Sequence, residues 1–482
     1  MGHKLKIASW LAIGAMAGAL TTIQLQAVAR NNITPLPLEE LQQLAAVFSM
    51  IKSDYVEPTD EKKLITDAIS GMVTGLDPHS AYYDKKAWKE FREGTSGAFV
   101  GVGIEITMED GLVKVVSPIE DSPAAAAGLI TNDLITKIDD TPVKGLTITE
   151  AVKRMRGEPG TQVRLRILRR ADDNKSFSVT ITRARIMTRS VKGKTLDNGY
   201  AWIRISQFQD RTVEDFAAKL QELASASPDM KGLVLDLRND PGGLLDAAVA
   251  VSATFLPADV PVVSTNGQLA ESRYVFQANP RYYWRRGGAD PLARLDQRTK
   301  GLFKKVPMVV LVNEGSASAS EIVAGALQDY KRATIMGNQT FGKGSVQTVR
   351  ALGPDTGLKI TTARYYTPKG RSIQAKGIVP DVLVDETPEG NLLAALSTRE
   401  ADLTKHLENG VEDPAEAAKR EQAREAAQAR LEERQRENPG ERLIPEYGSK
   451  EDFRLIQAIN HLEGQPVAVS KTLKARETSQ TE

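Results

Sequence analysis

The chain has 482 residues, of which 63 are Lys or Arg and 62 are Asp or Glu, so its formal net charge is +1. This balance gives no overall attraction for nucleic acid, and the length has room for about two to four domains. There is no cysteine, which excludes thiol nucleophiles, cysteine zinc sites and disulfides.

The first 29 residues are typical of an export signal. A short basic start, MGHKLK, precedes the apolar run IASWLAIGAMAGALTTIQLQA, and Ala27, Val28 and Ala29 form a small-x-small site. The pattern predicts cleavage after Ala29. The alternative is an uncleaved inner-membrane anchor, with peripheral membrane association of the body, because the apolar run approaches spanning length. Either way the body is exported, to the periplasm in a Gram-negative cell.

Amphipathic helices are expected in residues 30–96. LITDAISGMVTGL has one apolar face, and LEELQQLAAVFSMIKSDYV has apolar residues at helical spacing. Such stripes pack either in the core of their own chain or against another chain, and the sequence favours neither. The positions in the first helix are Leu38, Leu41, Leu44, Phe48 and Ile51.

Residues 97–186 are expected to form a module of short strands with two short helices. Strand-like runs include FVGVGIEI, GLVKVVSPI, TQVRLRIL and SFSVTITR, and Thr147 and Glu150 offer a capping box for the second helix. In this order the elements resemble a PDZ domain.

The resemblance to a PDZ domain gives a meaning to one glycine-containing loop. Glycines allow successive backbone N–H groups to converge on a terminal carboxylate, and an open strand edge accepts an extended peptide. The resemblance implies that the substrate C-terminus is held by Gly101, Val102, Gly103 and Ile104.

From residue 187 to residue 395 the chain alternates between strands and helices, which predicts an α/β domain with a largely parallel sheet. YAWIRISQF, GLVLDLR and VPMVVLV are the strand-like runs, and TVEDFAAKLQELA and LLDAAVAVSATFL are helical. DLRNDPGG follows a buried strand directly. Its glycines, Gly242 and Gly243, form either an ordinary tight turn or a source of N–H groups for an oxyanion.

The run NEGSASASEIVAGALQDY places Ser318 where a strand passes into a helix. A hydroxyl at such a corner lies beside unpaired helix N–H groups, which can hold a developing oxyanion. Ser318 and Glu321 also fit a capping box, so Ser318 could simply cap the helix.

Lys343 lies in FGKGSVQT, where an extended chain puts Lys343, Ser345 and Gln347 on one face. A lysine serves as a base for a serine if burial lowers its pKa, and Gln347 could hold the amine without adding charge. The alternative is a solvated loop lysine. Of the four histidines, only His79 could belong to a triad, and LDPHSAY instead places it in a turn after a helix.

Together these segments resemble the bacterial carboxyl-terminal processing proteases over residues 38–384. NEGSASASEI, TFGKGSVQ, GLVLDLRNDPGG and TTARYYTPKGRSIQAKGIVPDV occur in the family's order. The resemblance implies that Ser318 is the nucleophile, that Lys343, 25 positions later, is the base, and that Gln347 assists. It also implies an oxyanion hole made by Ala319 together with Gly242 or Gly243.

The family's architecture is a multidomain α/β protein: a ClpP/crotonase-like protease core with an inserted PDZ domain and helical N- and C-terminal segments. Its first helical segment contributes to dimerisation. By this resemblance, residues 187–395 are the core, with a lid near residues 265–300. RYYWRRGG, in that lid, mixes aromatics and arginines as a single-strand nucleic-acid site does, but here it favours a surface loop.

Residues 396–482 form a polar tail. Residues 415–438 indicate a charged helix or a partly disordered arm, and DFRLIQAINHL predicts a short amphipathic helix. That helix either binds a partner or docks onto its own core. Its apolar face is predicted to hold Phe453, Ile456, Ile459 and Leu462.

The sequence therefore predicts an exported serine endopeptidase that recognises exposed C-terminal tails of envelope proteins and needs no metal or other cofactor. The resemblance also implies a homo-oligomer and a lipoprotein adaptor as partners, and no nucleic acid. The first alternative is a PDZ adaptor or chaperone with a silent protease-like core. The second is a Ser-Lys amidase acting on cell-wall peptides, which leaves the PDZ-like module without a purpose.

Overall fold

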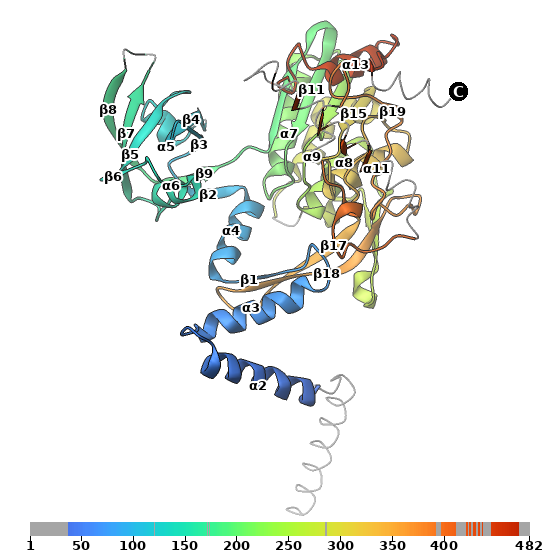
Figure 1. Ribbon diagram of the computed structural model, residues 1–482. Helices are drawn as coiled ribbons and strands as arrows, with labels where there is room; N and C mark the ends of the chain where they lie inside the picture. Colours follow the sequence, from blue (N-terminus) through green and yellow to red (C-terminus); the bar gives the residue numbers. More distant parts are fainter. Residues whose placement is uncertain are drawn as a thin grey trace, which may run out of the picture. The chain divides into compact units, whose positions relative to one another are not determined.

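The computed structural model in Figure 1 describes residues 37–471, except for residues 120, 171, 173, 285–286, 392–396, 411–420 and a set of positions between 423 and 444. It divides into two compact units, Met1–Met72 and Val73–Glu482. The export signal and its cleavage site after Ala29 lie outside the described residues. Within the described ranges, no helix combines the length and apolar character that would span a bilayer.

The N-terminal helices are α2 (Leu38–Asp54) and α3 (Glu61–Thr74). No residue of α2 is buried, and Leu38, Leu44 and Met50 are 66%, 49% and 61% exposed. The core-packing interpretation of this stripe is therefore not supported within the chain. The apolar face of α2 is left as open surface.

The PDZ domain is an antiparallel sheet in the order β3-β4-β5-β7-β8. Its strands are β3 (Ile104–Glu109), β4 (Leu112–Pro118), β5 (Leu134–Ile138), β7 (Gln162–Arg169) and β8 (Lys175–Thr182), with β6 (Thr141–Pro142) paired to β5. The helices are α5 (Pro123–Ala126) and α6 (Ile148–Met155). The predicted capping box of α6 is confirmed, because Thr147 N–H donates to Glu150 at 2.8 Å and Glu150 N–H to Thr147 Oγ1 at 3.3 Å.

The PDZ domain is inserted through a pair of strands that enter and leave it. These are β2 (Ala98–Gly101) and β9 (Ala184–Met187), which run antiparallel. Before β2, the chain forms α4 (Lys85–Ser96), which Asp84 caps by accepting from Ala87 N–H at 2.8 Å. The chain therefore enters and leaves this domain at neighbouring points, as expected for an inserted domain.

The α/β domain that follows is built on a sheet in the order β10-β11-β12-β15-β16-β19. Its strands are β10 (Val191–Thr195), β11 (Tyr200–Ile205), β12 (Gly232–Asp236), β15 (Met308–Val312), β16 (Thr334–Gly337) and β19 (Val382–Leu383). Only β10 is antiparallel to its neighbour. The predicted, largely parallel α/β sheet is confirmed, and β15, with the sequence MVVLV, is apolar throughout because both faces of the sheet are covered.

Each face of this sheet has its own layer. Ala201, Ile203 and Ile205 face the larger core, which contains α7 (Thr212–Ala226), α8 (Leu245–Phe255) and α11 (Ala319–Asp329). Trp202 points the other way, into a smaller core with α13 (Phe453–Leu462). Side chains alternate between faces along a strand, so one strand sequence serves both layers.

A second sheet carries the region around the lysine. It has the order β1-β18-β13-β14, with β17 also paired to β18. The strands are β1 (Ala81–Tyr83), β13 (Pro261–Asn266), β14 (Tyr274–Gln277), β17 (Ser345–Ala351) and β18 (Gly357–Tyr366). In β18, Gly357 lies against the Trp88 ring of α4, where an added Cβ would come within 2.4 Å of the ring.

The segment predicted as a lid has more buried structure than expected. It contains η3 (Pro280–Tyr282) and α9 (Pro291–Thr299), and α10 (Leu302–Lys305) follows it. Tyr282 and Tyr283 are only 7% and 8% exposed and belong to the larger core. The prediction of a surface loop for RYYWRRGG is therefore wrong for these two tyrosines, because their rings pack inward.

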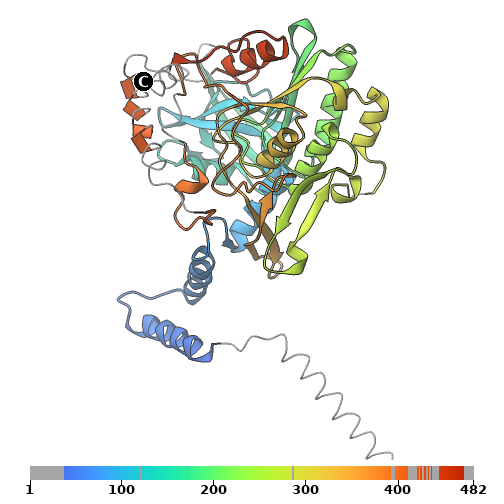
Figure 2. The same ribbon diagram turned by 90° about the vertical axis from the view of Figure 1, so that its right-hand side faces the viewer.

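Of the two alternatives for the C-terminal amphipathic helix, docking onto the core is the one observed. In Figure 2, α13 is the red helix lying against the core, and Leu455 and Ala458 are buried there. The predicted face is confirmed in part: Phe453, Ile459 and Leu462 pack against this core, whereas Ile456 is 41% exposed. Asp452 caps α13 and binds Arg238, and this anchor fixes the rotation of the helix. The described part of residues 415–438 is too fragmentary to test the charged helix.

Replacing Asp452 by Ala should destabilise the core. Arg238 is 1% exposed, with Asp236 and Asp452 each 2.6 Å from its Nη2 and the Tyr447 ring 4.1 Å away. Asp236 still pairs with Arg238 in this variant, but both hydrogen bonds from Arg238 to Asp452 are lost, and each hydrogen bond to a charged group is worth about 1.5–3 kcal/mol. Urea denaturation measures this.

Asp140→Ala is the matched control for Asp452→Ala. Asp140 bonds Arg164 at 2.6 Å, but its side chain is 93% exposed. An exposed pair is worth about 1 kcal/mol or less. Equal unfolding midpoints for the two variants would show that the Arg238 network contributes nothing special.

Candidate active site

Ser318 has a strained backbone at the start of α11. Its φ is +53° and its ψ is −108°, in a region that residues other than glycine rarely adopt. An ordinary N-cap residue has extended dihedrals instead. Glu321 does contribute its half of the predicted capping box, since Ser318 N–H donates to Glu321 Oε2 at 2.8 Å. Capping alone leaves the strain unexplained, and such strain is concentrated at functional sites.

The neighbouring serines have structural partners. Ser316 Oγ donates to Leu237 carbonyl oxygen at 2.8 Å, and Ser320 Oγ donates to Asp240 carbonyl oxygen at 2.9 Å. Both hydroxyls thereby fasten the serine turn to the turn that follows β12. Ser318 is the serine of this turn whose hydroxyl is not used to hold these two turns together.

Tyr365 of β18 lies next to Ser318 and was not predicted from the sequence. Burial raises the pKa of Tyr365 to about 12, while a hydrogen bond with the Ser318 side chain acts in the opposite direction. At neutral pH the tyrosine is therefore an uncharged hydroxyl beside the serine. No local sequence pattern distinguishes it from Tyr366, which follows it.

Lys343 is in contact with Gln347, as the alternation pattern predicted. Lys343 Nζ donates to Gln347 Oε1 at 2.5 Å. Burial lowers the pKa of Lys343 to about 8, and the positive charge of Lys359 lowers it further, while Glu400, Glu321 and Asp77 oppose the shift. The solvated-loop interpretation does not account for this environment.

Glu321 connects the serine to the lysine. In the described parts of the chain, no direct hydrogen bond joins Ser318 to Lys343. Instead, Glu321 Oε2 accepts from Ser318 N–H at 2.8 Å and from Lys343 N–H at 2.9 Å. Its Oε1 accepts from Thr340 Oγ1 at 2.5 Å and from Gly342 N–H at 2.7 Å. One buried carboxylate thus fixes the backbones of both residues.

The two glycines after β12 have different roles. Gly242 N–H donates to Asp240 Oδ1 at 2.8 Å, so it is not available to an oxyanion. A Cβ on Gly242 would come within 2.8 Å of Ser318 Cβ, so only glycine allows this close approach. By contrast, Gly243 N–H and Ala319 N–H have no acceptor among the described residues. These two N–H groups are the ones left for an oxyanion.

The loop at residues 101–104 is held through its carbonyl groups, which accept hydrogen bonds from neighbouring residues. Gly103 carbonyl oxygen accepts from Ile119 N–H and Ser122 Oγ, both at 2.9 Å, and Val102 carbonyl oxygen accepts from Ala124 N–H at 2.9 Å. Over the described ranges, Val102 N–H and Gly103 N–H have no acceptor. A loop whose carbonyls are fixed and whose N–H groups are unused suits a terminal carboxylate.

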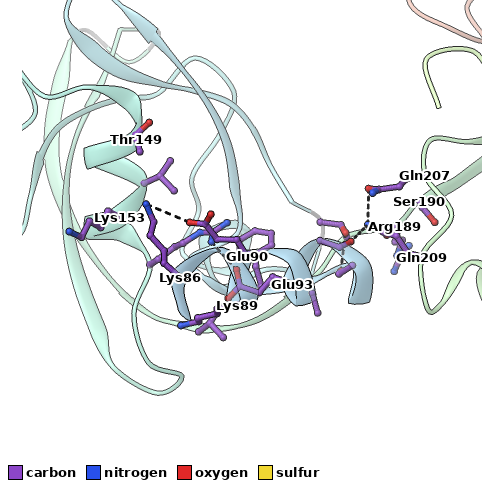
Figure 3. A pocket seen from close by; sticks show the side chains of 18 of the residues that line it. Lys86, Lys89, Glu90, Glu93, Thr149, Lys153, Arg189, Ser190, Gln207 and Gln209 are labelled. Carbon is purple, nitrogen blue, oxygen red and sulfur yellow. Dashed lines mark hydrogen bonds and ion pairs between the residues drawn. The ribbon is translucent and has the colours of Figure 1, made fainter. Parts of the chain in front are cut away.

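A pocket of about 850 Å³ lies beside the PDZ helix α6, bordered by α4, β2 and residues 188–190 and 206–209. Figure 3 shows α4 contributing Lys86, Lys89, Glu90 and Glu93, with Lys153 on α6. Basic side chains outnumber acidic ones on its lining. The basic residues are Lys86, Lys89, Lys153, Arg156 and Arg189, and the acidic ones are Glu90 and Glu93.

Comparisons with known proteins identify the families to which parts of this chain are similar. Residues 199–384 match peptidase family S41, residues 100–181 match the PDZ domain, and residues 9–87 match the activating protease CtpB N-terminal domain. The carboxy-terminal-processing protease of Bartonella bacilliformis is 41% identical over 397 residues, covering 82% of this chain and 86% of that protein.

Two further matches are weaker. A probable CtpA-like serine protease of Staphylococcus haemolyticus is 34% identical over 369 residues, covering 76% of this chain and 69% of that protein. Among solved structures, a photosystem II D1 C-terminal processing protease is 30% identical, with a TM-score of 0.39, covering 69% of this chain and 84% of that chain.

Proposed function

Because the chain belongs to peptidase family S41 and is a carboxy-terminal-processing serine protease with a PDZ domain, we propose that it is an exported endopeptidase that cleaves envelope proteins after binding their exposed C-terminal tails. The observation that carries this proposal is the pairing of Lys343 with Gln347 at 2.5 Å in an environment that lowers the lysine pKa. A half-buried amine with a lowered pKa, on a segment that shares the Glu321 carboxylate with the strained serine, is suited to general-base catalysis.

In the proposed mechanism, Ser318 Oγ attacks the scissile carbonyl carbon while neutral Lys343 Nζ takes the hydroxyl proton. Gly243 N–H and Ala319 N–H stabilise the resulting oxyanion, and no acceptor within the described residues competes for them. Lys343 then gives its proton to the leaving amine. In the second half, water attacks the acyl ester while Lys343 takes one of its protons, and Lys343 passes that proton to Ser318 Oγ as the acid product leaves. Gln347 keeps the amine in place throughout.

The PDZ loop and the basic pocket support recognition of a terminal carboxylate. The loop offers unused N–H groups, and the excess of lysine and arginine around the pocket favours an anionic chain end. We assign substrate selection to this region and bond cleavage to Ser318. An adaptor without activity would need no lysine with a lowered pKa held by Gln347.

Amidating the C-terminus of an unstructured substrate should raise its KM about tenfold or more, because the charge that the PDZ loop binds is removed. The kcat should change little, since the scissile bond lies elsewhere. Steady-state cleavage of matched free-acid and amide substrates measures this. Equal KM values would show that the PDZ domain does not select substrates by their termini.

Changing the substrate is a cleaner test than changing the loop. A Cβ on Gly103, whose φ is +82°, would lie 2.3 Å from Ser122 Cβ. Gly103→Val would therefore disturb the packing of the loop on α5 as well as its access to a peptide. We therefore expect Gly103→Val to disturb the fold of the PDZ domain, so that a loss of binding could not be assigned to a blocked site alone.

Export, self-association and an adaptor remain part of the proposal. Export is supported by the signal-like residues 1–29, and cell fractionation tests periplasmic location. The exposed apolar face of α2 supports a homo-oligomer, which sedimentation at several protein concentrations tests. Co-purification from the envelope tests for a lipoprotein adaptor.

A further inference from the structure

The turn at residues 77–80, between α3 and β1, reaches the surroundings of Lys343. β1 follows it directly and pairs with β18, with Ala81 opposite Lys359. The turn is thereby fixed beside Thr361, which is two residues further along β18 on the same face as Lys359. The predicted turn containing His79 is confirmed, and its contacts give it more than a connecting role.

A first chain of hydrogen bonds runs from Asp77 to the lysine. Thr361 Oγ1 donates to Asp77 Oδ1 at 3.1 Å, and Gln347 Nε2 donates to Thr361 Oγ1 at 3.2 Å. Gln347 Oε1 then accepts from Lys343 Nζ. An ionised carboxylate can only accept, so the Thr361 proton points toward Asp77 and its lone pairs toward Gln347. Gln347 Nε2 also donates to Ser345 Oγ at 2.9 Å, so Asp77, acting through Thr361, and Ser345 together turn the oxygen of the Gln347 amide toward the lysine.

That amide orientation matters for a base. A neutral amine has two protons and one lone pair. If one proton is donated to Gln347 Oε1, the position of the lone pair becomes restricted. Although burial acts to raise it, the pKa of Asp77 lies below its ordinary value because Ser80, the N–H groups of His79 and Ser80, and Thr361 donate to the carboxylate. Asp77 is therefore ionised at neutral pH and keeps this orientation.

A second chain starts from His79 and holds the backbone around the lysine. His79 Nε2 lies 2.7 Å from Glu400 Oε2, and Gln374 Nε2 donates to Glu400 Oε1 at 2.8 Å. Gly344 N–H donates to Gln374 Oε1 at 3.1 Å, and Glu400 N–H donates to Phe341 carbonyl oxygen at 3.0 Å. Glu400 is fully buried. Through Phe341 on one side and Gly344 on the other, it fastens the chain both before and after Lys343.

We propose that Asp77 and Glu400 are positioning residues for the catalytic base: Asp77 orients Lys343 Nζ through Thr361 and Gln347, and Glu400 fixes the loop that carries Lys343. The inference rests on the proposed function, in which Lys343 is the base. It assigns a catalytic role to the segment between the N-terminal helices and the PDZ domain, far from the serine and lysine motifs in sequence.

The charges around Lys343 provide a readout that a merely structural role would not move. Asp77, Glu400 and Glu321 favour the protonated lysine, and Lys359 disfavours it. Neutralising Asp77 or Glu400 should therefore lower the lysine pKa, whereas neutralising Lys359 should raise it. Because activity appears as the lysine loses its proton, the acidic limb of the kcat profile moves in the same direction.

The experiment measures kcat and KM from pH 5.5 to pH 9.5 for the full-length protein with an unstructured substrate. Asp77→Asn and Glu400→Gln should each shift the acidic midpoint down by about half a pH unit, and Lys359→Met should shift it up. Thr361→Val, which breaks the first chain without changing charge, should lower kcat about tenfold with KM nearly unchanged. Thr361→Ser should restore the rate.

Asp290→Asn is the matched control for Asp77→Asn. Asp290 also accepts from a backbone N–H, that of Leu292 at 2.9 Å, and from a hydroxyl, that of Tyr283 at 3.0 Å. Asp290 is absent from the charges that act on Lys343. The acidic midpoint of the kcat profile of Asp290→Asn should therefore match that of wild type. Thermal denaturation of every variant identifies those that have lost the fold.

The possible outcomes decide as follows. Opposite shifts for Asp77→Asn and Lys359→Met, together with the Thr361→Val loss, support the inference. Folded Asp77→Asn and Glu400→Gln variants with wild-type midpoints, and a Thr361→Val variant with wild-type kcat, overturn it. If Asp77→Asn does not fold, Thr361→Val decides alone. If Lys343→Ala keeps its activity, the proposed function itself fails, which is distinct from the failure of this inference.

Discussion

Ser318→Ala and Lys343→Ala should each lower kcat by about 10⁴-fold or more, and the double variant should be no worse than either single one. Members of a nucleophile–base pair act as a unit, so removing the second costs nothing once the first is gone. Cleavage of an unstructured protein substrate by purified variants measures this. Each variant should remain folded, because the backbone contacts of both residues run to Glu321 and not through the replaced atoms.

Ser320→Ala is the matched control for Ser318→Ala. Its hydroxyl donates to Asp240 carbonyl oxygen at 2.9 Å and is buried, so its loss should affect stability more than chemistry. We expect activity within about tenfold of wild type, because the variant loses only one hydrogen bond between uncharged groups. An inactive Ser320→Ala with an active Ser318→Ala would show that the nucleophile is assigned to the wrong residue.

A chelator should leave the wild-type rate unchanged.

The fold was largely predictable from periodicity, and the errors have a common cause. Continuous apolar runs identified β12 and β15 as buried strands, since both faces of a parallel sheet are covered. The buried face of α13 was predicted only in part, because Asp452, whose partner Arg238 is 214 positions away, sets a helix rotation that buries Leu455 and Ala458 and exposes Ile456. The inward packing of Tyr282 and Tyr283 likewise depends on tertiary contacts. Periodicity reports which residues are apolar, whereas distant contacts decide which way they face.

The site was predictable where its chemistry lies in short segments. The serine and lysine motifs identify Ser318, Lys343 and Gln347 as candidates, and the capping box identified Glu321, though only as a cap. The Asp77 and Glu400 contacts escaped because they join segments 284 and 321 positions apart. Hydrogen bonds of that range leave no periodic pattern. Only the buried polar side chains at their ends, brought together by the fold, reveal them.

Glu321→Ala should be the most damaging change that leaves both proposed catalytic side chains intact. It removes the acceptor of four donors, from Ser318, Gly342, Lys343 and the Thr340 hydroxyl. Each buried donor without a partner costs about 1–3 kcal/mol, so a loss of at least about 3 kcal/mol in stability is expected. Because the serine and the lysine share this one anchor, kcat should fall by about 10³-fold.

Glu321→Gln separates the charge from the hydrogen bonds. Its amide keeps one oxygen for two of the donors, so the loss of kcat should be smaller than for alanine. The pH dependence of stability should also change, because burial raises the pKa of Glu321 from an ordinary value of 4.5 to about 7 in the folded protein. Between these values the folded state binds more protons than the unfolded state, so this group's contribution to stability falls as the pH rises.

Urea midpoints at pH 5 and pH 8 measure that contribution. Wild type should lose more stability than Glu321→Gln between the two values, since the glutamine has no proton to release. Other titrating groups act equally on both proteins and cancel in the comparison. An identical pH dependence would mean that Glu321 is ionised throughout, held so by its four donors. In that case the ionised carboxylate would join the serine and lysine segments at every pH tested. Only Glu321→Ala would then measure how much Glu321 contributes to stability.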